Sequence, residues 1–321
     1  MVTLDEIRAA QRRIHGLAVH TPLIGCFSHQ CPGQIYIKAE SLQPIGAFKL
    51  RGAANKIAQL SRHELRRGVI TYSSGNHAQG VAYAARAFGS KAVIVMPSNA
   101  PEIKRRATAD LGAEIVTVGN ASSERKSKAE ELAAQHGYVV IPPYDDPDII
   151  TGQATCGLEI LKDLPNVDLV LAPVSGGGLL GGVAAAIKQL RPQCRVIGVE
   201  PELAADAHQS FHAGRIVSWP AEKTSRTIAD GLRTQSLGQL NYELIRACVD
   251  DIITVSEEEI RTAMRRILLD ARLTAEPSGA VTSAALLFHT SQLPPYRRAV
   301  PILSGGNVEP ALLAQILSQE S

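Results

Sequence analysis

Short runs of aliphatic and β-branched residues alternate along the chain with longer segments whose apolar positions recur at helical spacing. Residues 35–40 predict a strand, and residues 50–60 predict the helix after it. The same order recurs, with strands predicted at residues 69–72, 92–97, 115–118, 139–141, 169–174, 195–200, 251–255 and 299–303. Strands that alternate with helices indicate parallel sheets with helices on both faces. The pattern therefore predicts an α/β fold.

Two helix starts carry capping patterns. Thr3 with Glu6 predicts a capping box at the first helix, which is expected to end near Gly16. Residues 256–259 place acidic side chains in another first turn, where the helix dipole favours negative charge. Both patterns explain local structure and require no function.

The strands fall into an earlier and a later set, so the 321 residues are expected to form two open, mostly parallel sheets flanked by helices. No long linker, internal repeat or low-complexity segment separates the sets. We therefore expect two interleaved domains, a large one from residues 1–61 and 146–321 and a small one from residues 62–145.

An uncharged run between Asp168 and Lys188 approaches the length of a membrane span. Pro173 and the glycines at 176–178 interrupt it, so a buried strand, a loop and a helix are expected instead. The net charge is +2, with 33 basic and 31 acidic residues and no basic stripe for nucleic acid. A small-molecule partner is expected, without nucleic acid or a membrane.

Cysteine usage and the first residues indicate the compartment. The five cysteines are scattered and lack metal-ligand spacing, which argues against a disulfide framework and a zinc site. The first eight residues include acids and lack the apolar core of a signal peptide. We expect a reduced, cytoplasmic protein.

Lys49 is the first candidate for chemistry, because its neighbours Phe48 and Leu50 favour burial. A buried lysine pairs with a charge, loses its proton or reacts, and a neutral amine forms a Schiff base with a carbonyl. The ordinary alternative is a lysine whose stem is buried and whose ammonium reaches water. This segment by itself favours the ordinary alternative.

Three loops of glycine and polar residues follow predicted strands, at residues 73–77, 175–179 and 304–307. A loop between a strand and a helix places backbone N–H groups where they bind anions, and the carboxyl ends of parallel strands are where α/β sheets bind ligands. Any single loop is equally compatible with a tight turn. Together with Lys49, the three indicate a cofactor with a phosphate, an aromatic ring and a carbonyl.

These motifs, in this order, resemble the fold type II pyridoxal phosphate enzymes, in the branch of the serine/threonine dehydratases, serine racemases and hydroxyaspartate dehydratases. The resemblance runs from about residue 4 to residue 308, through segments 46–53, 73–77, 175–179, 227–231, 276–280 and 304–307. It implies the tryptophan synthase β-like fold, a homodimer, and pyridoxal 5′-phosphate bound by the large domain.

The resemblance implies a role for each matching cofactor residue. Lys49 would hold the cofactor as a Schiff base and, once released, remove the substrate α-proton. Phe48 would pack against the pyridine ring and Ser304 would face its nitrogen, which a serine does not hold protonated, so that expulsion of a β-substituent is favoured. The other cofactor-binding positions are Asn76 at the ring hydroxyl, Ser175, Gly176, Gly177, Gly178 and Leu179 at the phosphate, and Gly231 and Glu276.

The resemblance also implies the substrate contacts. Ser73, Ser74, Asn76 and His77 would surround the substrate, with the α-carboxylate bound by Ser73, Asn76 and His77. Ser74 matches the position that exchanges the α-proton from the face opposite the lysine in racemases, so it is a second catalytic candidate. From the residues alone, a histidine hydrogen-bonded near a helix start remains the more ordinary explanation of His77.

Arg125 and Thr234 match positions that reach a second substrate carboxylate in racemase-like relatives. Arginine suits a carboxylate because its planar fork donates two parallel hydrogen bonds. The alternative is a solvated arginine, because residues 124–128 read as a charged helix surface.

Glu200, Ala204 and Asp206 resemble the divalent-cation site of the branch, with oxygen ligands that suit magnesium or calcium. Two such carboxylates would otherwise be ordinary surface acids. One departure from the family pattern concerns Ile45 and Ala47, which stand where relatives usually carry hydroxyls.

The resemblance implies elimination of water from threonine or serine to give a 2-oxo acid and ammonia. The alternatives are a dehydratase for 3-hydroxyaspartate or phenylserine, a serine racemase, or a cofactor-binding carrier without turnover. Because the sequence stops soon after Asn307, a C-terminal regulatory domain with feedback inhibition is not expected.

Overall fold

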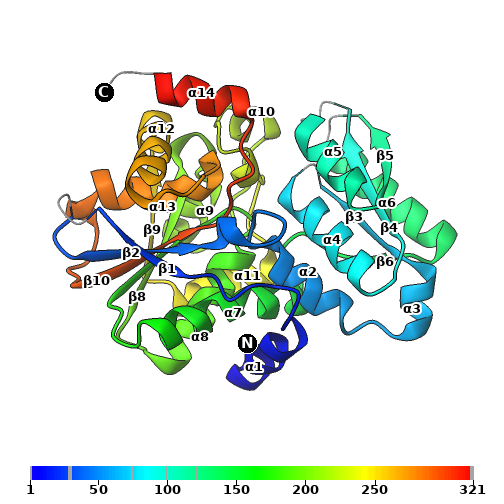
Figure 1. The fold of residues 1–321 in the computed structure, drawn as a ribbon, viewed down its shortest axis with the longest axis horizontal. Coiled ribbons are helices and arrows are strands. Elements are labelled where there is room, and N and C mark those ends of the chain that lie inside the picture. Colours follow the sequence, from blue (N-terminus) through cyan, green and yellow to red (C-terminus); the bar gives the residue numbers. More distant parts are fainter. Residues whose placement is uncertain are drawn as a thin grey trace.

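The computed structural model describes residues 2–27, 31–73, 75–98, 100, 102–119 and 122–318. Its strands form two separate sheets, which lie in the two lobes of the molecule (Figure 1). The larger sheet has the order β1-β2-β10-β7-β8-β9, and only the β1–β2 pair is antiparallel. These strands are β1 (Leu23–Cys26), β2 (Gln34–Ala39), β7 (Leu169–Pro173), β8 (Arg195–Pro201), β9 (Asp251–Val255) and β10 (Arg298–Leu303).

The smaller sheet is parallel throughout and has the order β5-β4-β3-β6. Its strands are β3 (Val69–Tyr72), β4 (Ala92–Pro97), β5 (Glu114–Val118) and β6 (Val139–Val140). All four lie in the sequence between β2 and β7 of the larger sheet. The expectation of two interleaved α/β units is therefore confirmed, while the domain boundaries at residues 61/62 and 145/146 stay a proposal.

Helices cover both sheets (Figure 1). Those nearest the smaller sheet are α3 (Arg62–Arg67), α4 (Asn76–Ala87), α5 (Glu102–Asp110) and α6 (Ser122–His136). The others are α1 (Leu4–Arg13), α2 (Lys49–Ile57), α7 (Pro147–Asp163), α8 (Gly178–Leu190), α9 (Asp206–Ala213), α10 (Ala221–Thr224), α11 (Gln239–Cys248), α12 (Glu257–Arg266), α13 (Pro277–Phe288) and α14 (Pro310–Ser318). Short turns of other helix types are η1 (Glu40–Leu42), η2 (Glu202–Ala204), η3 (Asp230–Leu232), η4 (Ile267–Ala271) and η5 (Thr290–Gln292).

Each buried strand of the larger sheet supplies side chains to two hydrophobic cores. Val170 packs in one core with residues of α8 and α11, whereas the next residue, Leu171, packs in the other with residues of α12 and α13. Ile252 and Ile253 of β9 divide in the same way. Successive side chains of a strand point to opposite faces, so a sheet covered on both faces needs continuous apolar runs. This explains why the strands were recognisable from the sequence.

Most local predictions are confirmed. Thr3 heads the predicted capping box with Glu6, and the helix after Ser256 carries the predicted acidic residues in its first turn. Ser256 also heads a capping box with Glu259, which was not predicted. The uncharged run forms β7, a loop and α8, and no helix in the described part of the chain is long and apolar enough to cross a membrane.

Two details differ from expectation. The first helix ends at Arg13 rather than near Gly16. Strand β1 was not predicted, because it is only four residues long, contains Gly25 and is not fully buried.

Candidate active site

A cavity of about 640 Å³ is lined by loops and helix starts from both lobes. It brings together nearly all predicted cofactor and substrate residues: Phe48, Lys49, Ser73, Asn76, His77, Arg125, Ser175, Gly176, Gly177, Gly178, Leu179, Gly231, Thr234, Glu276 and Ser304. Ser74 lies outside the described residues. The predicted metal ligands Glu200, Ala204 and Asp206 do not line the cavity.

Lys49 is the first residue of α2 and faces the cavity. Its Nζ donates a hydrogen bond of 2.6 Å to the carbonyl of Pro143 and lies 5.3 Å from the centroid of the Phe48 ring. Burial lowers the pKa of the Lys49 amine to about 8, because an ammonium is costly to remove from water. The amine is therefore far easier to deprotonate than that of a solvated lysine.

The loop before Lys49 is fastened to the loop after β10. The Phe48 N–H donates to the carbonyl of Ser304 at 3.0 Å, and the Gly306 N–H donates to the carbonyl of Gly46 at 2.9 Å. Gly46 has a φ of +70°, and a Cβ there would lie 2.4 Å from Oδ1 of Asn307, so glycine is required at this position. These two backbone hydrogen bonds hold Lys49 and Ser304 close to each other on neighbouring loops.

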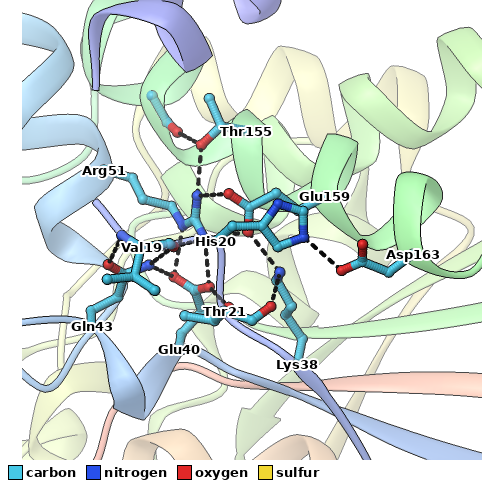
Figure 2. A network of polar contacts seen from close by, with 11 residues as sticks. Val19, His20, Thr21, Lys38, Glu40, Gln43, Arg51, Thr155, Glu159 and Asp163 are labelled. Carbon is cyan, nitrogen blue, oxygen red and sulfur yellow. Dashed lines mark hydrogen bonds and ion pairs between the residues drawn. The ribbon is translucent and has the colours of Figure 1, made fainter. Parts of the chain in front are cut away.

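A buried ion network centres on Arg51 of α2, which lies two residues after Lys49 in the sequence (Figure 2). The guanidinium of Arg51 donates to Glu40 at 2.7 and 2.8 Å and to Glu159 at 2.7 Å through each of two nitrogens. Lys38 Nζ donates to Glu159 at 2.6 Å and to the carbonyl of Thr21 at 2.7 Å. Two cations thus face two carboxylates, so the buried charges balance.

The glycine loop after β7 opens the helix α8. Gly177 is the N-cap residue, has a φ of +96°, and provides no side-chain cap for the N–H groups of the first turn. A Cβ on Gly176 would lie 2.4 Å from the Tyr144 ring, so this loop packs directly on that ring. Uncapped N–H groups at a helix start favour a bound anion.

The loop after β3 opens α4 in the same manner. Gly75 is the N-cap residue and makes no side-chain cap hydrogen bond. His77, in the first turn, is 2% exposed, and its Nε2 lies 3.0 Å from the carbonyl oxygen of Ile141. Burial and the nearby Lys49 lower the pKa of His77 to about 3. The imidazole is therefore neutral.

Asn76, beside His77, joins this loop to the other lobe. Its Nδ2 donates to Oε1 of Glu276 at 2.6 Å, and its Oδ1 accepts from Nδ2 of Asn307 at 2.8 Å. Burial raises the pKa of Glu276 to about 7, although the charge of Lys104 acts in the opposite direction. Oε2 of Glu276 is buried with no hydrogen-bond partner among the described residues.

Arg125 lies at the cavity rather than on a solvated helix surface. Its side chain is partly buried, and burial lowers the pKa of its guanidinium. Nε of Arg125 is buried and makes no hydrogen bond within the described ranges. Thr234 also lines the cavity, where its Oγ1 lies 2.6 Å from Ser175 Oγ.

Pro143, Tyr144 and Asp230 are among the residues that line the cavity without having been predicted as site residues. Pro143 and Tyr144 contact Lys49 and the Gly176 loop, and Lys104 forms an ion pair with Asp230. For Pro143 and Tyr144, the sequence offered one signal, which is their position shortly after the predicted strand β6. Lys104 carried no signal, because its partner is 126 residues away in the sequence.

The predicted metal ligands form a separate buried pair. Glu200 accepts hydrogen bonds from the N–H groups of Ala207 at 3.2 Å and His208 at 2.9 Å. Both carboxylate oxygens of Asp206 are buried without a hydrogen-bond partner in the described part of the chain. Burial raises the pKa of Asp206 to about 7, and burial together with Asp206 raises that of Glu200. No cluster of three or more His, Cys, Asp or Glu side chains suited to a metal occurs among the described residues.

The cavity residues fit pyridoxal phosphate. The amine of Lys49 is suited to its carbonyl, and the uncapped start of α8 is suited to its phosphate. Ser304, which is 3% exposed, provides a hydroxyl at the same cavity. The set therefore combines an amine donor, an anion site and polar groups that lack partners among the described residues.

Comparisons with known proteins agree with this geometry. A family model for pyridoxal-phosphate dependent enzymes matches residues 15–305. The catabolic L-threonine dehydratase of Escherichia coli strain K12 is 42% identical over 320 residues, which cover 98% of this chain and 96% of the relative. The L-threo-3-hydroxyaspartate ammonia-lyase of Saccharomyces cerevisiae is 40% identical over 318 residues, covering 98% and 96%. The structure of maize serine racemase aligns with a TM-score of 0.94 at 37% identity, covering 98% of this chain and 96% of its own.

Proposed function

The chain belongs to the family of pyridoxal-phosphate dependent enzymes and is an ammonia-lyase, and we propose that its substrates are L-threonine and L-serine. The reaction removes the α-proton and the β-hydroxyl, and the resulting enamine hydrolyses to a 2-oxo acid and ammonia. The amine of Lys49, which faces the cavity with a pKa lowered to about 8, supports the elimination chemistry, and the 42% identity to an L-threonine dehydratase supports the choice of substrates.

We propose that Lys49 removes the α-proton. A general base works best when its pKa lies near the working pH, and burial brings the amine into that range. The carbonyl of Pro143 accepts a hydrogen bond from Nζ and fixes the direction of the amine. The Phe48 N–H bond to Ser304 fixes the backbone at the same point.

The residues around the cofactor are proposed to orient it. Phe48 would pack on the ring, Asn76 would bond its hydroxyl, Ser304 would face its nitrogen, and the N–H groups from Gly176 to Leu179 would bind the phosphate. When bound, pyridoxal phosphate supplies a carbonyl that joins the substrate amine and a ring that withdraws electron density. Gly231 and Glu276 are proposed to complete this site.

The start of α4 is proposed to bind the α-carboxylate of the substrate. Ser73 and the N–H groups of the first turn, which no side chain caps, lie at the cavity. An anion is favoured there for the same reason as at α8. Asn76 remains tied to Glu276 and Asn307, so it would hold the loop in place as well.

Arg125 and Thr234 are proposed to admit a second carboxylate on the β-carbon, as in 3-hydroxyaspartate. Nε of Arg125, which has no hydrogen-bond partner in the part of the chain that the structure describes, supports this choice. An arginine that is partly buried and lacks a partner gains more from a carboxylate than a solvated one does.

An ammonia-release panel tests the proposed substrates and the proposed role of Arg125. It uses threonine, serine, 3-hydroxyaspartate and phenylserine in both configurations, on the wild type, Arg125→Ala and the control Lys126→Ala, whose side chain is 59% exposed. Loss of a charged hydrogen bond costs about 1.5–3 kcal/mol, so Arg125→Ala should lower kcat/KM for hydroxyaspartate about 10- to 150-fold and leave threonine and serine nearly unchanged. An equal fall for every substrate would remove Arg125 from the account. Absence of ammonia from the wild-type reactions with both L-threonine and L-serine would overturn the proposed substrates.

Serine racemisation is the second candidate function, supported by the structural likeness to maize serine racemase. It would require Ser74 as the acid or base on the second face, and Ser74 lies outside the described residues. Conversion of L-serine to D-serine, followed by chiral chromatography, tests it. A carrier without turnover would release no ammonia in the same assays.

We further propose that Glu200, Asp206 and the carbonyl of Ala204 bind magnesium or calcium. Two buried carboxylates repel each other when both are ionised, and a divalent cation relieves that cost. The unpartnered oxygens of Asp206 support this proposal.

A cytoplasmic homodimer stays a prediction. The five cysteines are free, which is compatible with a reducing compartment. Light scattering after size-exclusion chromatography measures the oligomeric state.

A further inference from the structure

The side chain of His77 is oriented by one hydrogen bond. A carbonyl oxygen only accepts, so the 3.0 Å contact between Nε2 and the Ile141 carbonyl places the proton of the neutral ring on Nε2. The other ring nitrogen, Nδ1, therefore carries a lone pair and no proton. The lowered pKa of His77 is consistent with a ring that does not gain a second proton.

Nδ1 of His77 is an acceptor without a donor. The atom is buried, makes no hydrogen bond within the described residues, and belongs to a residue that lines the active-site cavity. Lys49, whose charge acts on His77, directs its Nζ to the Pro143 carbonyl. A buried acceptor left without a donor is costly, which favours a ligand that supplies one.

The substrate chemistry restricts which donor that is. A carboxylate only accepts hydrogen bonds, so Nδ1 and the α-carboxylate repel rather than pair. The sequence-based assignment of His77 to the carboxylate can therefore hold only for its backbone N–H. Pyridoxal phosphate, when bound, would engage the α-amino group through its carbonyl, so the β-hydroxyl is the donor that a β-hydroxy amino acid has left for Nδ1.

We propose that Nδ1 of His77 accepts a hydrogen bond from the substrate β-hydroxyl and thereby selects β-hydroxy amino acids. The inference rests on the proposed ammonia-lyase function and adds a specificity residue to it. With the O–H proton directed at His77, the oxygen lone pairs of the leaving group remain free to receive a proton. His77 itself does not supply that proton, because Nε2 is committed to Ile141.

A binding measurement tests the inference without turnover. α-Methyl-L-serine and 2-aminoisobutyrate both lack an α-proton and differ only in the β-hydroxyl. The wild-type holoenzyme should bind α-methyl-L-serine about 10-fold more tightly, followed by the change in cofactor absorbance. A tenfold ratio corresponds to about 1.4 kcal/mol, in the range of one hydrogen bond.

Three variants identify the atom responsible. His77→Phe should abolish the tenfold preference, and His77→Asn should keep it within about threefold, because its amide oxygen retains an acceptor beside the backbone. Thr71→Val is the matched control, since Thr71 Oγ1 donates to the same Ile141 carbonyl at 2.7 Å and does not line the cavity. In both His77 variants, the Ile141 carbonyl still accepts the hydrogen bond from Thr71, so neither variant leaves this carbonyl without a donor. Thr71→Val should alter both affinities equally.

Turnover provides an independent arm. His77→Phe should lower kcat/KM for L-serine about 10-fold and for β-chloro-L-alanine less than about 2-fold. The chlorine substituent carries no hydrogen, so it donates no hydrogen bond to Nδ1 that the variant could lose. Equal affinity of the wild type for the two unreactive ligands, or an equal effect of His77→Phe on both, would overturn the inference. A hydroxyl preference that depends on His77, in an enzyme that releases no ammonia, would sustain it and refute the lyase function instead. If His77→Phe does not fold, the wild-type ratio is the deciding measurement, because equal affinity for the two unreactive ligands overturns the inference.

Discussion

Burial sets the protonation of individual groups around the cavity. The pKa values of Lys49, His77 and Glu276 are each shifted in the direction of the uncharged form, because the cavity removes water without supplying a full counter-charge. Arg51, which is more deeply buried than Lys49, keeps its charge because Glu40 and Glu159 surround it. The difference between the reactive lysine and the structural arginine thus lies in their partners.

Lys49→Ala should abolish cofactor attachment. The purified wild type is expected to be yellow and to absorb in the visible range, because a bound pyridoxal group joined to an amine absorbs there. Lys91→Ala is the control, since the Lys91 side chain is 50% exposed and pairs with Glu114. Visible spectra of the three proteins after addition of pyridoxal phosphate provide the measurement. A colourless wild type that cannot be reconstituted would contradict the proposed site.

Glu276→Gln should change how stability depends on pH. The folded protein raises the pKa of Glu276 from 4.5 to about 7, so it binds this proton more tightly than the unfolded chain does. This contribution to the free energy of unfolding is complete below pH 4.5 and is lost as the pH rises to about 7. The variant should show a smaller decrease over that interval, measured by urea unfolding. Glu222→Gln, an exposed acid on α10, should keep the wild-type slope; an identical slope in Glu276→Gln would refute the shift.

Helix α2 is positioned by charges that come from separate elements. Arg51 of α2 contacts Glu40 of η1 and Glu159 of α7, and Lys38 of β2 shares Glu159 (Figure 2). All four side chains are at most 5% exposed. Since Lys49 begins the same helix, the network holds the reactive amine on a rigid element.

Arg51→Met should be strongly destabilising. It leaves Glu40 and Glu159 buried with only Lys38 to balance them, and breaking a buried ion pair costs about 3–5 kcal/mol. Arg195→Ala provides the control, because Arg195 is 57% exposed in its pair with Asp250 and should cost at most about 1 kcal/mol. Urea unfolding of both variants gives the two free energies. Similar losses would show that the network does not behave as a buried one.

At the scale of the whole molecule, the active site depends on contacts between the two lobes. Asn76 in the smaller lobe reaches Glu276 and Asn307, and Lys104 of α5 pairs with Asp230 of η3. The cavity therefore exists only when both sheets are folded and in contact. The interleaved order of the sheets favours contact between the lobes, because two chain connections join the smaller lobe to the larger one and limit their separation.

Cation binding at Asp206 should stabilise the entire fold. A ligand that binds only the folded state raises stability by mass action, so a chelator should lower the Tm of the wild type. Asp206→Asn should show no response to the chelator, whereas Glu202→Gln, an exposed acid in the same segment, should respond like the wild type. Thermal melting with and without chelator provides the measurement. The same response in all three proteins would remove the metal from the account.

The sequence by itself determined the local features. Strand and helix alternation, the capping patterns at Thr3 and Ser256 and the glycine loops depend on neighbours within one turn or one strand, so their signals are contiguous. The order of motifs around Lys49 then indicated the family, which the comparisons confirm.

Only the tertiary structure decided which side chains meet. The partners of Arg51 and Lys49 lie 108 and 94 residues away in Glu159 and Pro143, and no periodicity links such positions. The same holds for His77, whose acceptor nitrogen follows from a carbonyl 64 residues away. Protonation and hydrogen-bond direction depend on burial and on the atoms opposite, and these are properties of the folded chain rather than of any segment.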